Sequence, residues 1–389
     1  MTKTINRLGS IDVIRALTMF LMIFVNDLWS LVNVPKWLEH VDVQTDGMGL
    51  SDVIFPAFLF IVGLSIPFSV ENRIKKGDST IQLLKHIFIR SFALLVIGFF
   101  HVNLESYNPD ALLPKPIWQI LITLAFFLIW LDYPRDMIKS KKFTLQGIGV
   151  AMLILLAAIY KGGDATHPVW MKHYWWGILG LIGWAYLLCS TIYVLSKGNL
   201  VALITSFIAL IALNSAFHAQ LIPPHLHLWV VGDGSTATLT MAGILTALIY
   251  KKHADHNLYL WLLLAGFAII LFAFGFGTRP IWGISKLRGT PSWTTICSGI
   301  TIVVFMLLIW LVDIKNKESW FKILKPAGTA TLTAYLLPYF HYAIYTIIGW
   351  KLPEVLRDGT IGIIKSLLYS LIIILITGWL EKRRIKLKL

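Results

Sequence analysis

Stretches of about 20 apolar residues recur from one end of this chain to the other, and they constrain its fold more than any other feature. A helix needs about that length to cross the hydrocarbon core of a bilayer. Hydrophobic residues make up 57% of the chain and charged residues only 14%, with a mean hydropathy of +0.73. Charged residues make up about 25% of a typical soluble domain. The pattern therefore predicts an all-α polytopic membrane protein.

The apolar windows predict a bundle of about twelve transmembrane helices within one domain, residues 1–389. Two windows, 174–196 and 200–217, are joined by only three residues, so they form a tight helical hairpin if both span; eleven spans are the alternative. The predicted spans lie near residues 11–30, 51–70, 86–104, 112–132, 144–161, 174–196, 200–217, 235–251, 258–276, 293–312, 327–348 and 362–380.

The net charge of +14 raises the question of a nucleic-acid partner. If the N-terminus is cytoplasmic, most of the 34 lysines and arginines fall in inner loops and in the C-terminal tail. This distribution follows the positive-inside rule and explains the charge without nucleic acid. The first apolar stretch has no small-residue cleavage site after it, so we expect it to remain as a span. We expect both termini in the cytoplasm and a bacterial inner membrane as the location, with lipid as the surroundings.

Polar residues gather at one depth on the expected outer side. Each alone is more often a packed interfacial residue than a functional one, but their shared depth favours a common outward cavity. Trp37 is singled out among the outer tryptophans as a sugar-stacking candidate because it lies three residues before His40. The residues concerned are Asn26, His40, Asp52, His101, Asn103, Gln119 and His341.

Two arginines lie one turn inside the inner ends of their spans, Arg15 in the first and Arg90 in the third. The guanidinium group suits phosphate, and an arginine buried in a bundle needs an anionic partner. The alternative is that Arg15 pairs with Asp12 at i, i+3, or that both snorkel to lipid headgroups. We weigh the two interpretations equally on physical grounds.

This arrangement predicts a polyanionic donor that enters from the cytoplasm and an acceptor that meets it near the outer face. Coenzyme A is such a donor, because its phosphates suit inner basic residues and its thin arm can pass between helices. The sequence has no P-loop or Rossmann fingerprint, and no cysteine or histidine spacing typical of zinc. We therefore expect no metal and no nucleotide hydrolysis.

Several runs of the sequence resemble one enzyme family. The segments 7–16, 24–26 and 49–63, with His40 between them, are similar to the heparan-α-glucosaminide N-acetyltransferases, and more so to bacterial transmembrane glucosamine N-acetyltransferases. The strong resemblance covers about residues 7–105, the expected catalytic core, and leaves 112–389 as the remaining helices. Shorter and sparser similarities to the family follow at Arg90-Ser91-Phe92, Val102-Asn103, Gly232-Asp233-Gly234, Ser285-Lys286 and Trp293-Thr294.

The resemblance implies transfer of acetyl from cytoplasmic acetyl-CoA to the amine of a glucosamine unit across the membrane. It maps the essential histidine of the family onto His40 and the active-site asparagine onto Asn26. It makes Asp233, in one of the sparser matches, a further substrate candidate, and it makes a homodimer plausible. The donor contacts expected from Asp12, Arg15 and Arg90 rest on their position near the inner face, where the donor must enter.

Two departures from the family stand out. The lysosomal enzyme carries an N-terminal luminal domain and an additional first span, whereas this sequence begins at the shared core. A helical pair around 140–217 is expected to be additional as well, so acceptor contacts on that side cannot be carried over from the family.

The chemistry suits these residues. Histidine has an unperturbed pKa of about 6.5, which suits removal of an ammonium proton near neutrality. It can instead take the acetyl group itself as a covalent intermediate. The Asn26 amide can donate to the oxyanion that forms.

Two other functions compete with this one. A transporter of amino sugars also fits twelve spans with buried polar residues, and uptake independent of acetyl-CoA would favour it. An O-acyltransferase of the acyltransferase-3 type has a similar Asp and Arg opening its first span, and would form an ester product instead of an amide.

Overall fold

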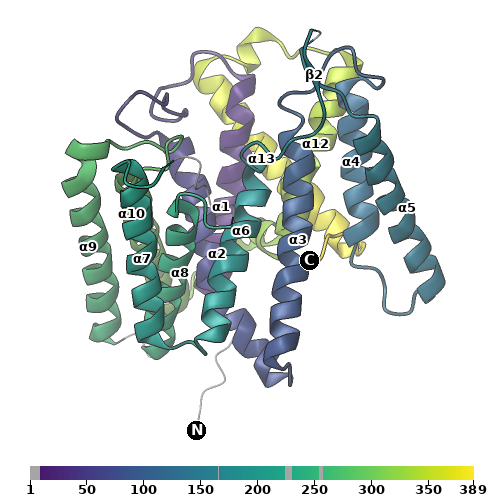
Figure 1. Ribbon diagram of the computed structural model, residues 1–389. Helices are drawn as coiled ribbons and strands as arrows, with labels where there is room; N and C mark the ends of the chain where they lie inside the picture. Colours follow the sequence, from purple (N-terminus) through teal and green to yellow (C-terminus); the bar gives the residue numbers. More distant parts are fainter. Residues whose placement is uncertain (1–8, 165, 224–229, 254–256) are drawn as a thin grey trace.

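A computed structural model describes residues 9–164, 166–223, 230–253 and 257–389, and most of these residues are helical (Figure 1). Eight of the helices are long and apolar enough, by length and composition, to cross a membrane. The prediction of an all-α polytopic membrane protein is confirmed.

Each of the twelve predicted spans coincides with one helix of the structure. These helices are α1 (Gly9–Asp27), α2 (Leu50–Lys75), α3 (Thr80–Val102), α4 (Lys115–Trp130), α5 (Lys139–Ala158), α6 (Gly177–Leu195), α7 (Leu200–His218), α8 (Ser235–Lys252), α9 (Leu258–Trp282), α10 (Pro291–Leu308), α12 (Thr331–Ile348) and α13 (Gly359–Lys382). The predicted tight hairpin is present, since α6 ends and α7 begins around Lys197-Gly198-Asn199. Twelve membrane crossings remain a prediction, because α1, α4, α8 and α12 are not among the eight helices that meet the spanning criteria.

Short elements connect these helices. A π-helical turn at Ile309–Ile314 extends α10, and a five-residue helix, α11 (Lys325–Thr329), precedes α12. The remaining short elements are β1 (Gly162–Gly163), β2 (Pro168–Val169) and 3-10 turns at Leu28–Ser30, Glu318–Leu324 and Glu354–Leu356.

Glycines allow the central helices to lie very close together. A Cβ atom at Gly63 of α2 would collide with the main-chain oxygen of Thr240 on α8, and one at Gly243 would collide with that of Phe60. Helices in a membrane gain contact by such close approach, because lipid offers no hydrophobic driving force between them. This crossing holds α2, which carries residues of both candidate sites, at the centre of the molecule.

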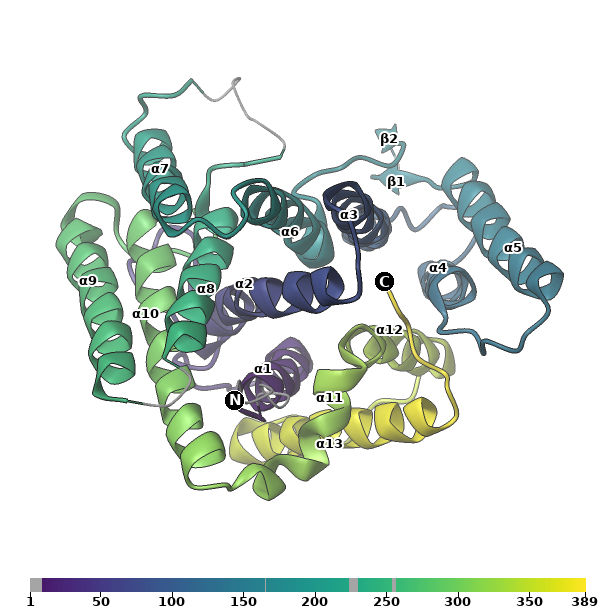
Figure 2. The ribbon, with the colours of Figure 1, turned by 90° about the horizontal axis from the view of Figure 1, so that it is seen from below.

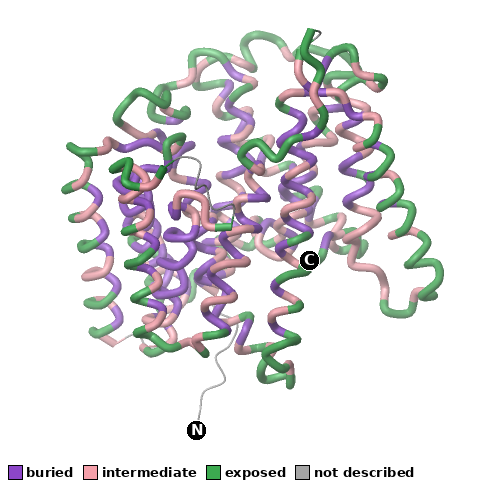
Figure 3. The backbone as a smooth tube through the Cα atoms, in the orientation of Figure 1, coloured by how far each residue is buried: buried purple, intermediate pink, exposed green. Residues whose placement is uncertain are grey.

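The bundle has a buried centre and an outer layer (Figure 3). In the most apolar 18-residue stretch of each helix, 67% of the residues are buried in α2 but only 17% in α5. Figure 2 shows α5, α7 and α9 at the periphery, with α1 and α2 inside. The outer helices therefore present most of their apolar side chains to the surroundings, as helices facing lipid do.

Candidate active site and donor cavity

His40 lies in the loop between α1 and α2 and is held by a buried carboxylate. Its Nδ1 atom lies 2.7 Å from Oδ1 of Asp52, a residue in the first turn of α2. The imidazole side chain is 48% exposed, whereas the Asp52 side chain is 1% exposed. One face of the histidine is thus fixed by the protein and the other is open to a ligand.

The same carboxylate folds the loop back onto α2. The main-chain N–H groups of Val41 and Gly49 donate to Oδ2 of Asp52, at 3.0 and 3.1 Å. The bond from Gly49 caps the helix, because the first N–H groups of a helix have no partner within it. Asp52 thus orients His40 and its loop, and its expected contact with substrate stays a prediction.

Lys286 joins this pair from the loop between α9 and α10. Its Nζ atom lies 3.3 Å from Nδ1 and 3.4 Å from Nε2 of His40. Burial lowers the pKa of Lys286, against the opposing effect of the Asp52 carboxylate. Three ionisable groups from distant segments therefore meet at one place.

A second set of bonds fastens the Lys286 loop to the His40 loop. Asp46 accepts the Ile284 N–H through Oδ1 at 2.7 Å and pairs with Nε of Arg279 through Oδ2 at 2.9 Å. The Gly47 N–H donates to the Ile284 carbonyl at 2.9 Å. The N–H bond from Ile284 and the neighbouring Arg279 lower the pKa of Asp46. We call these contacts the Asp46 latch.

Helix α10 supports the site from behind. The indole Nε1–H of Trp293 donates to the main-chain oxygen of Asp52 at 3.0 Å. Trp293 is 2% exposed, so this bond lies in the core. It sets the position of α10 relative to the start of α2, and with it the position of the loop that carries Lys286.

Asn26 lies in the last turn of α1 and is partly buried. The side chain makes no hydrogen bond with any residue that the structure describes. Its neighbour Asp27 is buried and accepts bonds from Lys365 at 2.7 Å, Ser366 at 2.6 Å and Tyr342 at 2.8 Å. These bonds tie the outer end of α1 to α12 and α13, and leave the Asn26 amide available to a ligand.

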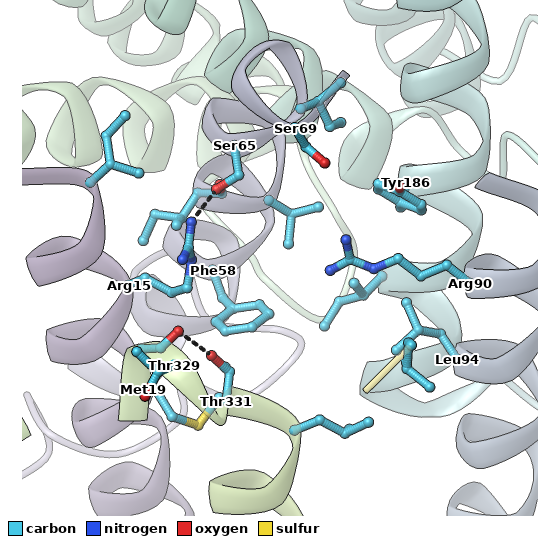
Figure 4. A pocket seen from close by; sticks show the side chains of 18 of the residues that line it. Arg15, Met19, Phe58, Ser65, Ser69, Arg90, Leu94, Tyr186, Thr329 and Thr331 are labelled. Carbon is cyan, nitrogen blue, oxygen red and sulfur yellow. Dashed lines mark hydrogen bonds between the residues drawn. The ribbon is translucent and has the colours of Figure 1, made fainter. Parts of the chain in front are cut away.

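A cavity of about 740 Å³ lies on the inner side of the bundle, and its lining includes all three predicted donor contacts, Asp12, Arg15 and Arg90. Figure 4 shows Arg15 and Arg90 reaching into it from opposite sides. Arg15 donates to Ser65 at 2.8 Å and pairs with Asp12 at 3.3 Å. The i, i+3 pairing considered as an alternative is therefore present, inside the same cavity.

Arg90 is held differently. Its guanidinium lies over the Tyr186 ring, 4.8 Å from the centroid. Its Nε atom is buried and has no hydrogen-bond partner in the described part of the chain. A buried donor without an acceptor is costly, so this arginine suits an anionic ligand in the cavity.

The cavity extends from the inner end of α2, at Lys75, up to Met22 and Phe58. Phe58 and Asp52 are six residues apart on α2, which is about 9 Å along a helix axis. The cavity therefore approaches the level of His40 without including it among its lining residues.

The other predicted substrate contacts lie on the outer side but differ in their surroundings. Trp37 is 66% exposed in the His40 loop. His101 is buried and stacked on Tyr339, 4.0 Å between ring centroids, and neither ring nitrogen has a partner among the described residues. His341 is exposed and lies against the rings of Tyr342 and Tyr369.

Three of the predicted substrate contacts make structural bonds. The Asn103 amide donates to the Phe99 and Lys172 carbonyls and accepts the Lys172 N–H, which fastens the 159–176 segment to α3. Gln119 donates to the Tyr339 carbonyl at 2.7 Å. Asp233 accepts the N–H and the hydroxyl of Ser235 at the start of α8. These bonds join helices and loops, and the substrate contacts expected from these three residues stay predictions.

Sequence reasoning missed Lys286 and Asp27 as site residues. In the sequence Lys286 stands out only through the Ser285-Lys286 pair, one of the sparser similarities to the family. Asp27 had a usable signal, because a carboxylate beside Asn26 at a span end needs a partner, and Lys365 lies at the edge of another span.

Comparisons with known proteins address the first part of the chain. The family model of the heparan-alpha-glucosaminide N-acetyltransferase catalytic region matches residues 7–115. The mouse heparan-alpha-glucosaminide N-acetyltransferase (Mus musculus) is 37% identical over 154 residues, which are 37% of this chain and 23% of the mouse protein. The human enzyme (Homo sapiens) is 36% identical over 97 residues, 25% of this chain and 14% of the human protein.

The matched region of this chain covers less than a quarter of the length of each of these curated relatives. The segment that matches the family model holds His40, Asp52, Asn26 and both cavity arginines, and it excludes Lys286. Residues 7–115 are therefore similar to the catalytic region of the heparan-alpha-glucosaminide N-acetyltransferases.

Proposed function

We propose that this protein transfers acetyl from acetyl-CoA to the amine of a glucosamine unit. The observation that carries this proposal is the His40–Asp52 pair at 2.7 Å on the outer side, above a cavity whose polar lining includes two arginines. The match of residues 7–115 to the family model of an N-acetyltransferase catalytic region supports the same reaction.

The cavity residues fit the phosphates of coenzyme A. Arg90 has a buried Nε–H without an acceptor among the described residues, and Arg15 reaches in from the opposite wall. Charge-assisted bonds from guanidinium to phosphate are strong and geometrically specific. Bound acetyl-CoA supplies an activated thioester, whose thin arm would pass Met22 and Phe58 toward the outer side.

His40 is the general base of the proposed reaction. Its Nδ1–H donates to the Asp52 carboxylate, which selects the tautomer with a free lone pair on Nε2. Nε2 accepts a proton from the ammonium group, and the resulting amine attacks the thioester carbonyl to form the C–N bond. The C–S bond then breaks, Nε2 returns its proton to the leaving sulfur, and the second proton of the nitrogen passes to water. The same nitrogen would be the nucleophile if His40 carried the acetyl group itself.

Asn26 is the proposed oxyanion donor. Its amide makes no hydrogen bond with the described residues, and it lies one turn beyond Met22, a residue at the upper part of the cavity. A fixed amide donor at a developing oxyanion contributes about 3 kcal/mol in known enzymes. The Asp27 bonds to α12 and α13 keep this end of α1 in place.

The proposed topology places His40 outside and the arginine cavity toward the cytoplasm of a bacterial inner membrane. The distribution of basic residues supports it. Leu38 is buried, so a cysteine probe belongs at the exposed neighbour Glu39. A cysteine at Glu39 should react only from outside, and one at Lys141 only from the cytoplasm; labelling of position 39 from the cytoplasm would reverse the assignment.

Activity is tested with purified protein in detergent, acetyl-CoA and glucosamine, with the product identified by mass spectrometry. We expect an amide product, and a loss of at least about two orders of magnitude in His40→Ala, the scale of acid–base catalysis. Acetyl-CoA affinity should stay near that of the wild type, because the cavity lining does not include His40.

His167→Ala is the matched control, since this histidine is highly exposed in the loop between β1 and β2. An ester product would indicate an O-acyltransferase instead. Glucosamine acetylation by His40→Ala at the wild-type rate would remove His40 from the mechanism.

A further inference from the structure

We propose that Lys286 keeps His40 in its neutral, proton-accepting form, and that the Asp46 latch positions Lys286 for this role. The inference rests on the proposed function of His40 as the base, and it concerns Lys286, which lies outside the segment that matches the family.

The geometry separates the roles of the two partners of His40. Asp52 lies 2.7 Å from Nδ1, the distance of a strong charge-assisted bond, and takes the Nδ1 proton. Nζ of Lys286 is nearly equidistant from the two ring nitrogens, at 3.3 and 3.4 Å. An ammonium placed alongside the ring in this way acts mainly through its charge, and it leaves the Nε2 lone pair open to an incoming amine.

The two partners act in opposite directions on the imidazole. The Asp52 carboxylate favours the imidazolium form, because an opposite charge close to a histidine stabilises its protonated state. A protonated histidine cannot serve as a base. The Lys286 ammonium disfavours the imidazolium form, because two like charges would lie within 3.4 Å. The ring therefore gains orientation from Asp52 without losing its lone pair.

The titratable groups around His40 lie on α2, on α10 and in the loop between α9 and α10. Asp52 faces both His40 and Lys286 from α2, and buried Cys297 faces Asp52 from α10, with its Sγ 4.0 Å from the Asp52 main-chain oxygen. Cys297 and Asp52 are also the titratable groups that act on Lys286. The charge balance at His40 therefore depends on Asp52 and Lys286.

The Lys286 side chain reaches His40 because its loop is fastened at both ends. The Asp46 latch holds Ile284, two residues before Lys286. On the other side, the Gly289 and Thr290 N–H groups bond to the carbonyls of Lys286 and Ser285, at 3.0 and 3.1 Å. Lys286 is thus a positioning residue that acts through His40.

The test measures the pKa of His40 directly, by NMR titration of isotope-labelled histidine in detergent-solubilised protein. The His40 signal is assigned by its absence in His40→Gln. Lys286→Met removes the charge at similar length, and Lys286→Arg keeps it. We expect the His40 pKa in Lys286→Met to exceed that of the wild type by at least about one unit, the effect of one charge at this distance in a largely aqueous dielectric. Lys286→Arg should stay close to the wild type.

The pH profile of kcat/KM should change together with the His40 pKa. The rising acidic limb should move to higher pH in Lys286→Met by the same amount, with activity recovered at alkaline pH, and should stay in place in Lys286→Arg. A merely structural role would lower activity at every pH without moving this limb. Lys286→Gln replaces Lys286→Met if thermal unfolding shows that the methionine variant is misfolded.

An identical His40 pKa in the wild type and in the neutral variants would overturn the inference. Because the titration needs no turnover, its outcome is separate from that of the proposed function. A raised His40 pKa in a protein that acetylates nothing would sustain the electrostatic coupling and reject the acetyltransferase activity.

Discussion

The two candidate regions of this molecule handle charge in different ways. At the outer site, His40 lies 2.7 Å from Asp52 and 3.3 Å from Lys286, and backbone N–H groups of Val41 and Gly49 donate to the Asp52 carboxylate. In the inner cavity, Arg90 is held by an aromatic ring and keeps a buried Nε–H without an acceptor among the described residues. A site that is electrostatically complete before ligand binds suits chemistry, and one that lacks an anion suits binding.

This contrast predicts that substitutions in the two regions affect different measured quantities. Changes at the outer site should lower the rate of transfer and leave donor affinity unchanged. Changes in the cavity should weaken the binding of acetyl-CoA.

The largest effect is expected at Asp52, on the rate. Asp52→Asn keeps the shape of the side chain but removes the carboxylate that selects the Nδ1–H tautomer of His40. We expect kcat to fall by about a hundredfold, with the dissociation constant of acetyl-CoA unchanged in calorimetry. A variant whose donor affinity fell as much as its rate would show that the two regions are not separate.

The next effect is expected at the cavity arginines, on binding. Arg90→Ala and Arg15→Ala should each weaken acetyl-CoA by about 1.5–3 kcal/mol, the cost of a lost charged hydrogen bond. Titration calorimetry measures this, with Arg383→Ala as a control, because Arg383 lies over the Trp379 ring and does not line the cavity. Wild-type donor affinity in both cavity variants would return these arginines to the lipid-snorkelling interpretation.

The smallest effect is expected at the Asp46 latch. Asp46→Asn removes an exposed ion pair with Arg279, and such pairs contribute at most about 1 kcal/mol. We expect kcat at neutral pH to fall by less than about fivefold, through looser placement of Lys286. A loss as large as that of Asp52→Asn would show that Asp46 belongs to the reacting site itself.

The Asp46 latch and His40 should respond to different ranges of pH. The pKa of Asp46 is lowered below its ordinary value of 3.8 by the Ile284 N–H and Arg279. The latch therefore contributes stability above this value, and that stability is lost as the pH falls through the lower folded-state pKa. Between pH 5 and 8 Asp46 does not titrate, so an activity limb in that range belongs to another group, and in Asp46→Asn it should keep its shape.

Local properties of the chain were sufficient to predict the helices and part of each site. An apolar window of about 20 residues specifies a helix wherever it lies, which is why twelve predicted spans match twelve helices. The depth of Arg15 and Arg90 within their spans follows from helical rise alone, whereas the packing of the helices brings both to one cavity. His40 and Asn26 followed from a resemblance confined to the beginning of the chain.

The tertiary structure decided which polar groups meet. Lys286 lies 246 residues after His40, and it reaches the imidazole because Trp293 and the Asp46 latch hold α10 and its loop against the start of α2. Asn103 shows the converse, since its amide is occupied by the backbone of Lys172, 69 residues later. Residue type and span depth determine that a polar group faces the outer side, whereas long-range contacts between helices and loops determine its partner, because those contacts depend on how the helices pack and not on the local sequence.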